Sequence, residues 1–167
     1  MQTFLPLPSF SSSARCLDNK RLGKQRVEAL QILKALHGDY DKTSAWVNHP
    51  ATKMWMWYEP ALTLYKDLCI IEWVARGFNN SMELTYTHKQ SGDYGAGEIT
   101  PPWFGRDEFH ASHRSNLLKK DPEYYSQFGW TEPHDLPYIW PPTGPCPPEW
   151  HQYNTAVHKE PTTNERP

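Results

Sequence analysis

Three stretches of the chain carry apolar side chains every three or four residues, which is the spacing of an amphipathic helix. The first stretch follows candidate N-cap residues, Ser11 to Ser13 and then Asp18, and it ends near Leu36. Gly38 comes next and is suited to close the last turn. The pattern therefore predicts a long first helix. Its apolar positions are Leu22, Ala29, Leu30, Leu33 and Leu36.

The second and third stretches predict two more helices. Residues 51–76 form the most apolar part of the chain, and Pro60 interrupts them where proline favours the first turn of a new helix. Gly77 follows as a candidate helix stop. The third stretch covers residues 107–120 and should end before Pro122, because proline disfavours a helical conformation in the preceding residue.

The segments between and after these stretches predict no further long element. Residues 79–105 are rich in Gly, Asn, Ser and Thr, which predicts a long loop with at most a short hairpin. Nine of the sixteen prolines lie after residue 132, so the end of the chain should be extended. We therefore expect an all-α fold, with one compact domain of three main helices over residues 1–140 and a Pro-rich acidic tail over residues 141–167.

The composition limits the class of protein. Aromatic residues make up 14% of the chain, including eight Trp, which is enough large apolar surface for a folded core. No run of about 18 apolar residues occurs, so we expect no membrane-spanning helix. The first ten residues lack the basic and apolar regions of a signal peptide. Three widely spaced cysteines, an odd number, favour a reducing compartment. These features predict a cytoplasmic protein.

Charge is unevenly distributed, although the net charge is only −2. Residues 1–36 hold six basic and two acidic side chains, a balance of +4. Residues 121–167 hold two basic and seven acidic side chains, a balance of −5. Binding to a polyanion depends on local rather than total charge. The basic N-terminal segment therefore favours a nucleic-acid partner.

One face of the first predicted helix carries the clearest candidate chemistry. Arg21, Lys24 and Glu28 are spaced by three and four residues and share that face, with Gln25 beside them. Two interpretations are open: a solvated face with a Lys24–Glu28 ion pair, or a phosphate-binding stripe around a single carboxylate. His49 lies in an Asn-His-Pro turn before a Trp-rich segment, where it is either a structural residue or part of a site.

The third predicted helix offers a second candidate face. His110 and His113 are three residues apart, but no CxxC or HExxH motif accompanies them, so we predict no metal and no cofactor. The alternative is a cationic face that approaches nucleic acid together with the first helix. Its members are His113, Arg114, Lys119 and Lys120, followed by Tyr124 and Tyr125. The Trp residues are more typical of a buried core than of a base-stacking platform.

Several segments together match a known family. Residues 68–79 close with Arg-Gly-Phe-Asn, residues 113–125 end in a Tyr pair, and residues 21–33 hold Glu28. With these segments the chain resembles the pyrimidine-dimer DNA glycosylase family over residues 1–140. It is most similar to a bacterial branch that opens with Phe-Leu-Pro and continues Leu-Asp-x-Lys-Arg-Leu-Gly-Lys-Gln-Arg-Val-Glu.

The resemblance implies a mostly α fold and a mechanism. In that mechanism an N-terminal α-amine attacks C1′ of a damaged nucleotide, expels the base and permits β-elimination. Glu28 corresponds to the catalytic glutamate, and Arg21 to a histidine of the site. Position 2 is the bulky Gln2, so Met1 should be retained, and its amine is the candidate nucleophile. The alternative nucleophiles are Lys20, Lys24 and a water molecule activated by the glutamate.

The sequence therefore predicts a monomeric enzyme that removes a damaged or modified pyrimidine from double-stranded DNA, with AP-lyase activity where an imine forms. The residues expected to bind DNA are Lys20, Arg21, Lys24, Gln25, Arg26, His49, His113, Arg114, Lys119, Lys120, Tyr124 and Tyr125. Three alternatives stay open: a glycosylase for a bulky phage-type modified base, a DNA-binding module without catalysis, and a metal-dependent nuclease that uses His49, His110 or His113.

Overall fold

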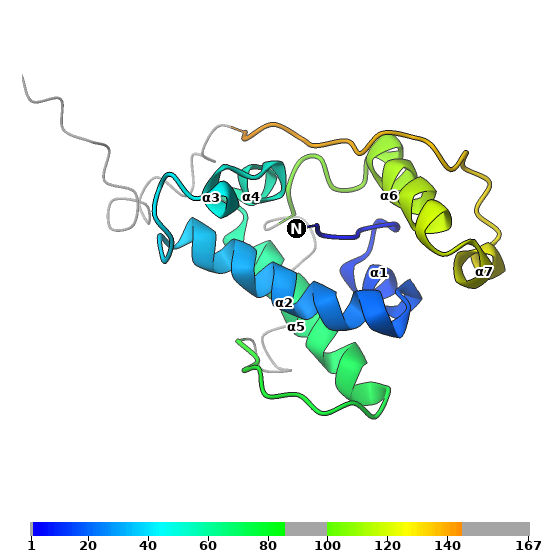
Figure 1. Cartoon of the computed structure of the whole chain (residues 1–167), viewed down its shortest axis with the longest axis horizontal. Helices are drawn as coiled ribbons and strands as arrows, with labels where there is room; N and C mark the ends of the chain where they lie inside the picture. Colours follow the sequence, from blue (N-terminus) through cyan, green and yellow to red (C-terminus); the bar gives the residue numbers. More distant parts are fainter. Residues whose placement is uncertain (1, 86–99, 145–167) are drawn as a thin grey trace, which may run out of the picture.

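The computed structural model of the chain describes residues 2–85 and 100–144. Within these residues it contains seven α-helices, one short 3-10 helix and no β-strand, so the predicted all-α fold class is confirmed. The elements are α1 (Phe10–Cys16), α2 (Asn19–Leu36), α3 (Ala45–Asn48), α4 (Pro50–Trp55), α5 (Glu59–Ala75), α6 (Asp107–Lys120), α7 (Pro122–Tyr125) and η1 (Ser126–Phe128). Figure 1 shows α2 and α5 crossing in the body of the molecule, with the N-terminal segment between α2 and α6.

The three long helices begin and end close to where the sequence predicts. α2 begins after Asp18, whose side chain accepts an N–H hydrogen bond of the first turn at 3.0 Å. Pro60 lies in the first turn of α5, and α6 covers the predicted residues 107–120. Gly38 and Gly77, which follow α2 and α5, have φ values of +86° and +87°, a left-handed conformation that glycine adopts without strain.

The N-terminal caps differ from the prediction. Ser11 to Ser13 lie inside α1, and the residue that caps it is Ser9, whose hydroxyl accepts an N–H hydrogen bond at 3.2 Å. Leu17 has extended backbone dihedrals and separates α1 from α2, because Asp18 caps a second helix directly after the first. The polar connection expected over residues 39–50 also contains a short helix, α3, and α4 follows it.

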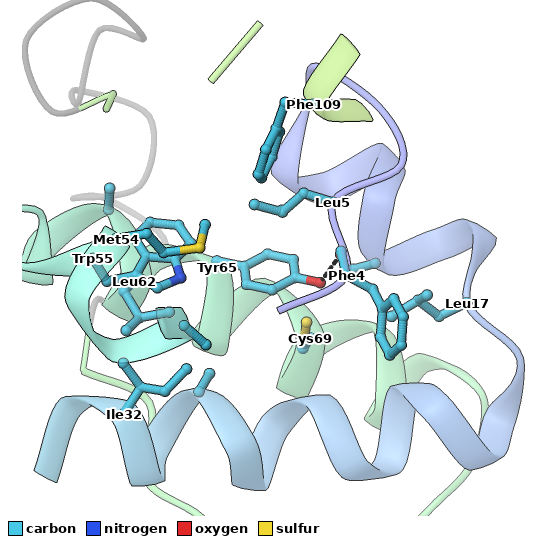
Figure 2. Packing of buried hydrophobic residues seen from close by; sticks show 14 of the residues in the cluster. Phe4, Leu5, Leu17, Ile32, Met54, Trp55, Leu62, Tyr65, Cys69 and Phe109 are labelled. Carbon is cyan, nitrogen blue, oxygen red and sulfur yellow. Dashed lines mark hydrogen bonds between the residues drawn. The ribbon is translucent and has the colours of Figure 1, made fainter. Parts of the chain in front are cut away.

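The core lies between α2, α5 and the N-terminal segment. Both α1 and α2 pack against α5. Figure 2 shows Ile32 of α2, Trp55 of α4 and two α5 residues, Leu62 and Tyr65, gathered in one cluster. The Tyr65 hydroxyl donates a hydrogen bond to the Phe4 carbonyl, which ties the N-terminal segment to the core. Large buried rings dominate the packing of a domain of this size.

The extended N-terminal segment, residues 2–8, is held from both sides. On the α2 side, the Gln25 Oε1 accepts from the Phe4 N–H at 2.7 Å, and its Nε2 donates to the Gln2 carbonyl at 2.8 Å. Gln25 is fully buried, so both bonds are shielded from water. This amide therefore fixes the position along α2 at which residues 2–4 cross the helix.

On the α6 side, two histidines hold the same segment through Leu5. The Leu5 N–H donates to the Nδ1 of His113 at 3.2 Å, and its carbonyl lies 2.7 Å from the Nδ1 of His110. The Nε2 of His110 accepts from the Gly105 N–H at 2.9 Å, so its Nδ1 is the nitrogen that donates to Leu5. Burial lowers the pKa of His113 to about 3, with His110 acting in the same direction, and keeps that ring neutral.

Residues 131–144, which we call the strap, contain no helix or strand and run from the end of the helical body past α6 towards α4 (Figure 1, yellow to orange). The Ile139 N–H donates to the Ser112 hydroxyl of α6 at 3.3 Å. Near the other end, the Thr143 hydroxyl donates to the Lys53 carbonyl of α4 at 3.0 Å. The strap is thus extended, as the prolines predict, and it joins two helices that are distant in sequence.

The predicted loop and tail are described only in part. Residues 79–85 and 100–105 contain no helix or strand, in agreement with the predicted loop. Residues 86–99 of that loop and residues 145–167 of the predicted tail lie outside the described residues. In the part that is described, no helix has the length and apolar character needed to cross a membrane.

Candidate functional site

A cleft of about 460 Å³ is formed where five parts of the chain meet: the N-terminal segment, α2, the α3–α4 junction, the end of α6 and the strap. It is lined by Gln2, Phe4, Lys20, Arg21, Lys24, Glu28, His49, Lys120, Tyr138 and Trp140. The lining thus includes six residues that the sequence singled out. These are Lys20, Arg21, Lys24, Glu28, His49 and Lys120.

The α2 side of the cleft carries one carboxylate among cations. Lys20, Lys24 and Glu28 follow one another at intervals of four along α2, so they lie on the same face of the helix. Within the part of the chain that the structure describes, Glu28 makes no hydrogen bond or ion pair, and neither do Lys20, Lys24 and Lys120. The Lys24–Glu28 ion pair of a solvated face is therefore not formed, and none of these four charges is paired with another described residue.

Arg21 also lines the cleft, but the protein itself holds its guanidinium. Its Nη1 donates to Asp18 at 2.5 Å and lies 3.5 Å from Asp121, and its charge lies 5.5 Å from the centre of the Tyr125 ring. Burial alone would raise the pKa of Asp18, but hydrogen bonds from Arg21 and Tyr125 lower it below its ordinary value. Arg21 is therefore oriented by a network, and its charge is partly neutralised, unlike that of Lys24.

His49, Tyr138 and Trp140 form an aromatic wall of the cleft. The His49 Nδ1 accepts from the Ala51 N–H at 3.0 Å and so caps α4. Its ring meets Trp140 edge to face, with centroids 5.8 Å apart, and the Tyr138 and Trp140 centroids are 5.6 Å apart. Burial lowers the pKa of His49 and favours its neutral form. The wall is therefore an uncharged surface of flat rings that lines the same cleft as the charged face of α2.

Sequence reasoning missed the contributions of Gln2, Phe4, Tyr138 and Trp140. Each pair is two residues apart in an extended segment, and alternate residues of extended chain point to the same side. That alternation was the available signal, but it does not reveal which segments approach α2. Met1, the predicted nucleophile, lies outside the described residues, although it is bonded directly to the cleft-lining Gln2.

Several residues predicted to bind DNA do not line the cleft. They are Gln25, Arg26, His113, Arg114, Lys119, Tyr124 and Tyr125. Gln25, His113 and Tyr125 are buried, and their polar atoms bond to the protein itself. Lys119 is exposed next to the cleft-lining Lys120. The structure therefore separates these seven into three buried residues, one exposed residue beside the cleft, and three partly buried residues outside it, Arg26, Arg114 and Tyr124.

Arg26 and Arg114 are held by neighbouring side chains. The Arg26 guanidinium lies 4.4 Å from the centre of the Trp73 ring, on the side of α2 that packs against α5. The Arg114 Nε donates to Glu132 at 2.5 Å, and this ion pair links α6 to the strap. Both arginines thus make contacts that stabilise the fold.

The histidines do not form a metal-binding group in the described structure. Within residues 2–85 and 100–144, no three His, Cys, Asp or Glu side chains are arranged to hold a metal ion. Both ring nitrogens of His110 and the Nδ1 of His113 bond to backbone groups. The predicted histidine pair therefore holds the N-terminal segment in this structure.

Comparison with known proteins places the chain in a family. The sequence model of a family described as pyrimidine dimer DNA glycosylase matches residues 1–86, just over half of the 167 residues. This range holds α1 to α5 with the four cleft residues of α2 and with His49, whereas Tyr138 and Trp140 lie beyond it. No curated protein and no solved structure matches the chain. The chain belongs to the pyrimidine dimer DNA glycosylase family.

Proposed function

We propose that the protein removes a damaged pyrimidine, with the cis-syn pyrimidine dimer as first candidate, from double-stranded DNA, and that the cleft is its active site. The family supports the glycosylase class and DNA as the substrate. The observation that carries the proposal is the Glu28 carboxylate. It lines the cleft with Lys20 and Lys24 on the same face, and it has no partner within the described chain. A free carboxylate beside free cations suits chemistry on a polyanion.

The proposed nucleophile is the α-amine of Met1, which follows from its bond to the cleft-lining Gln2. An α-amine has a pKa of about 8, against about 10.4 for lysine, so a useful fraction is neutral near pH 7. Its lone pair forms a bond to C1′ of the sugar while the bond from C1′ to the base breaks. The base takes the bonding pair and a proton, and in a dimer it stays attached to the neighbouring pyrimidine through the cyclobutane ring. Loss of the amine proton and opening of the sugar ring then give an imine at C1′.

The imine permits the second proposed step, which cleaves the strand. It makes the C2′ proton acidic, and a base removes that proton as the C2′–C3′ double bond forms. The C3′–O bond breaks, and the phosphate leaves with the bonding pair. Glu28 is proposed to stabilise the positive charge that develops at C1′ and to transfer protons in these steps.

Lys20, Lys24 and Lys120 are the proposed phosphate contacts. They line the cleft from α2 and α6, and none has a partner within the described chain. Each phosphate that a protein neutralises releases counterions, so log K should fall with log salt by about 0.9 per contact. C1′ is out of reach inside a stacked duplex, so a nucleotide must be extruded, which requires least free energy at damaged bases.

Borohydride trapping tests this proposal. The protein is incubated with a duplex that carries one cis-syn thymine dimer, reduced, and mapped by peptide mass spectrometry. We expect an adduct on Met1, both in the natural sequence and in a Lys20→Arg, Lys24→Arg double variant, which keeps both charges but lacks those primary amines. An adduct confined to Lys20 or Lys24 assigns the nucleophile to that lysine. Cleavage of the glycosidic bond without an adduct, detected as thymine set free by photoreversal of the dimer, indicates attack by water. If neither an adduct nor glycosidic cleavage is observed, the proposal is contradicted.

A further inference from the structure

His49 lies at the α3–α4 junction and uses its two ring nitrogens differently. The Nδ1 accepts from the Ala51 N–H at 3.0 Å, which caps α4. A nitrogen that accepts a hydrogen bond carries a lone pair, so the proton of the neutral ring is on Nε2. The Nε2 makes no hydrogen bond within the described residues. Because His49 is half-buried and lines the cleft, its ring brings an N–H donor to the cleft wall.

The ring of His49 is held in this neutral form. Burial lowers its pKa, and the positive charge of the chain's N-terminus acts in the same direction. A second proton would have to bind Nδ1, and it would break the hydrogen bond from Ala51. At neutral pH the Nε2–H is therefore a hydrogen-bond donor without charge, so the ring is neither a base nor a cation for phosphate.

The surroundings of this donor suit a base rather than a phosphate. His49 belongs to the uncharged wall with Tyr138 and Trp140, whereas the unpaired lysines of the cleft lie on α2 and at the end of α6. Phosphates are attracted to those lysines. Two other uncharged polar side chains of the cleft, Gln2 and Tyr138, hydrogen-bond to each other. The Nε2–H of His49 is therefore the donor best placed for a carbonyl group of a base beside the wall.

Cleavage of the glycosidic bond needs a donor of this kind. As the bond between N1 and C1′ breaks, the electron pair stays on the base, and its negative charge spreads from N1 to O2 of the adjoining C2 carbonyl. A dimerised thymine keeps this carbonyl, although its C5 and C6 are saturated. A hydrogen bond to O2 is stronger in the transition state than in the bound substrate, so it accelerates the step. Glu28 is assigned to the positive charge on the sugar, so the charge on the base requires a different partner.

We propose that the Nε2–H of His49 donates a hydrogen bond to O2 of the pyrimidine as it leaves the sugar, which makes His49 a catalytic residue of the glycosidic step. The ring keeps its own proton. The proton that the base takes up is balanced by the one that the attacking α-amine loses. The same side chain thus caps α4 through one nitrogen and serves the reaction through the other. This inference rests on the proposed function.

The variant His49→Asn separates the two roles of the ring. Asn is a favoured N-cap residue, so its oxygen can still accept from the Ala51 N–H, but it is too short to place a donor where Nε2 lies. Single-turnover glycosidic cleavage of a thymine-dimer duplex should slow by about 10- to 100-fold, the value of one hydrogen bond to a developing charge. The melting temperature should change by less than about 3 °C. His37→Asn is the matched control, at an exposed residue outside the cleft lining, and should leave the rate unchanged.

Two further measurements distinguish this role from a phosphate contact and from a proton donor. Both proteins are titrated with a duplex that carries tetrahydrofuran, a sugar analogue without a base, in place of the lesion, and their affinities should agree within about twofold. The ratio of the natural rate to the His49→Asn rate should stay constant between about pH 7 and pH 9, because a neutral N–H does not titrate there. The other titratable side chains of the cleft are the same in both proteins: Lys20, Arg21, Lys24, Glu28, Lys120 and Tyr138.

Equal rates of glycosidic cleavage for the natural protein and His49→Asn would overturn this inference alone. Weaker binding of the variant to the base-free duplex would also overturn it, because it indicates a phosphate contact. A rate ratio that falls as the pH rises would indicate a protonated imidazole, and a marked fall in melting temperature would indicate a structural role; either result overturns the inference. If the natural protein leaves the glycosidic bonds of the dimer intact, the proposed function is contradicted, and this inference with it.

Discussion

The two long faces of α2 use the same kinds of residue in opposite ways. On the cleft face, Lys24 and Glu28 have no partners within the described chain. On the face that packs against α5, the Arg26 guanidinium lies 4.4 Å from the centre of the Trp73 ring and donates to Asn80 at 2.8 Å. Lys24 and Arg26 are only two residues apart, yet one charge is free and the other is enclosed.

The difference shows that a cation near a candidate site is informative only together with its neighbours. Burial lowers the pKa of Arg26, and an aromatic ring covers it, so its charge mainly serves packing. The charge of Lys24 is exposed and is stabilised by nothing in the described protein. A ligand anion therefore gains most from the face where the protein has left charges unpaired.

The largest expected effect concerns the carboxylate of the cleft face. Glu28→Gln should slow cleavage of the glycosidic bond by about 10²- to 10⁴-fold, the contribution of a positioned acid–base group, because the amide neither accepts a proton nor stabilises positive charge. Binding to the damaged duplex and the melting temperature should change little. Single-turnover kinetics and a binding titration measure the two quantities separately.

Glu72→Gln is the matched control for that experiment. Glu72 lies on α5, away from the cleft, and is paired with Arg76 at 2.8 Å. The same chemical change there should leave glycosidic cleavage within about twofold. It should reduce stability by about 1 kcal/mol, because the pair is partly buried but the Gln amide oxygen can still accept from Arg76. Similar losses of activity in both variants would contradict the catalytic role proposed for Glu28.

Acid should loosen the N-terminal segment, whose Leu5 bonds to His113, before it disturbs the packing of α2 against α5. The pKa of His113 is about 3 in the folded protein, below the ordinary 6.5, so between these values the unfolded chain binds a proton that the folded one excludes. The contribution of neutral His113 to the free energy of unfolding is fully present above pH 6.5. It should fall by about 1.4 kcal/mol per pH unit as the pH drops towards 3. Urea unfolding at pH 8 to 4.5 measures this slope.

The His113→Asn variant isolates the contribution of that ring. The Asn oxygen can still accept from the Leu5 N–H but does not titrate. The slope of the free energy of unfolding against pH should therefore be smaller in this variant, by the value that one proton contributes. Amide exchange should show residues 2–8 opening in acid while the end of α5 stays protected. An equal acid slope in both proteins would show that His113 does not govern the N-terminal segment.

The sequence predicts the long helices because their signals are local. The apolar period, the N-cap residue and the glycine that ends a helix all lie within one segment. For α2 the N-cap is Asp18 and the glycine is Gly38. The short helices α3, α4 and α7 have four to six residues, too few for a period to emerge. The separation of α1 from α2 was missed because two cap signals close together, the Ser cluster and Asp18, were assigned to one helix.

The candidate site follows the same rule. The spacing of Arg21, Lys24 and Glu28 predicts a shared helix face from local geometry, and all three line the cleft, together with Lys20. Tyr138 and Trp140 reach the cleft through hydrogen bonds between the strap and distant helices, such as Ile139 to Ser112 of α6. Such pairings depend on the whole fold, so no pattern within one segment reveals them.

A smaller effect distinguishes the two cations directly. Lys24→Gln should weaken binding to duplex DNA and reduce the dependence of log K on log salt by about 0.9, with stability within about 0.5 kcal/mol. Arg26→Gln should leave the salt dependence unchanged but reduce stability by about 1–2 kcal/mol, since it loses the Trp73 and Asn80 contacts. Equal changes in salt dependence would mean that Arg26 also contacts phosphate.

The smallest expected effect tests how tightly the packed face is filled. A Cβ at Gly23 would lie 2.9 Å from the Trp73 ring, which is held by Phe78 stacked at 4.1 Å and by its own N–H bond to the Asn79 carbonyl at 2.8 Å. Gly23→Ala gains about 1 kcal/mol of helix propensity but overpacks the contact by about 1–3 kcal/mol, so a net loss of about 1 kcal/mol is expected in urea unfolding. In a Trp73→Leu background the ring is gone, and the same substitution should become stabilising. A stabilising effect with Trp73 present would show that the packed face has room to yield, and the contrast with the open cleft face would then rest on charge alone.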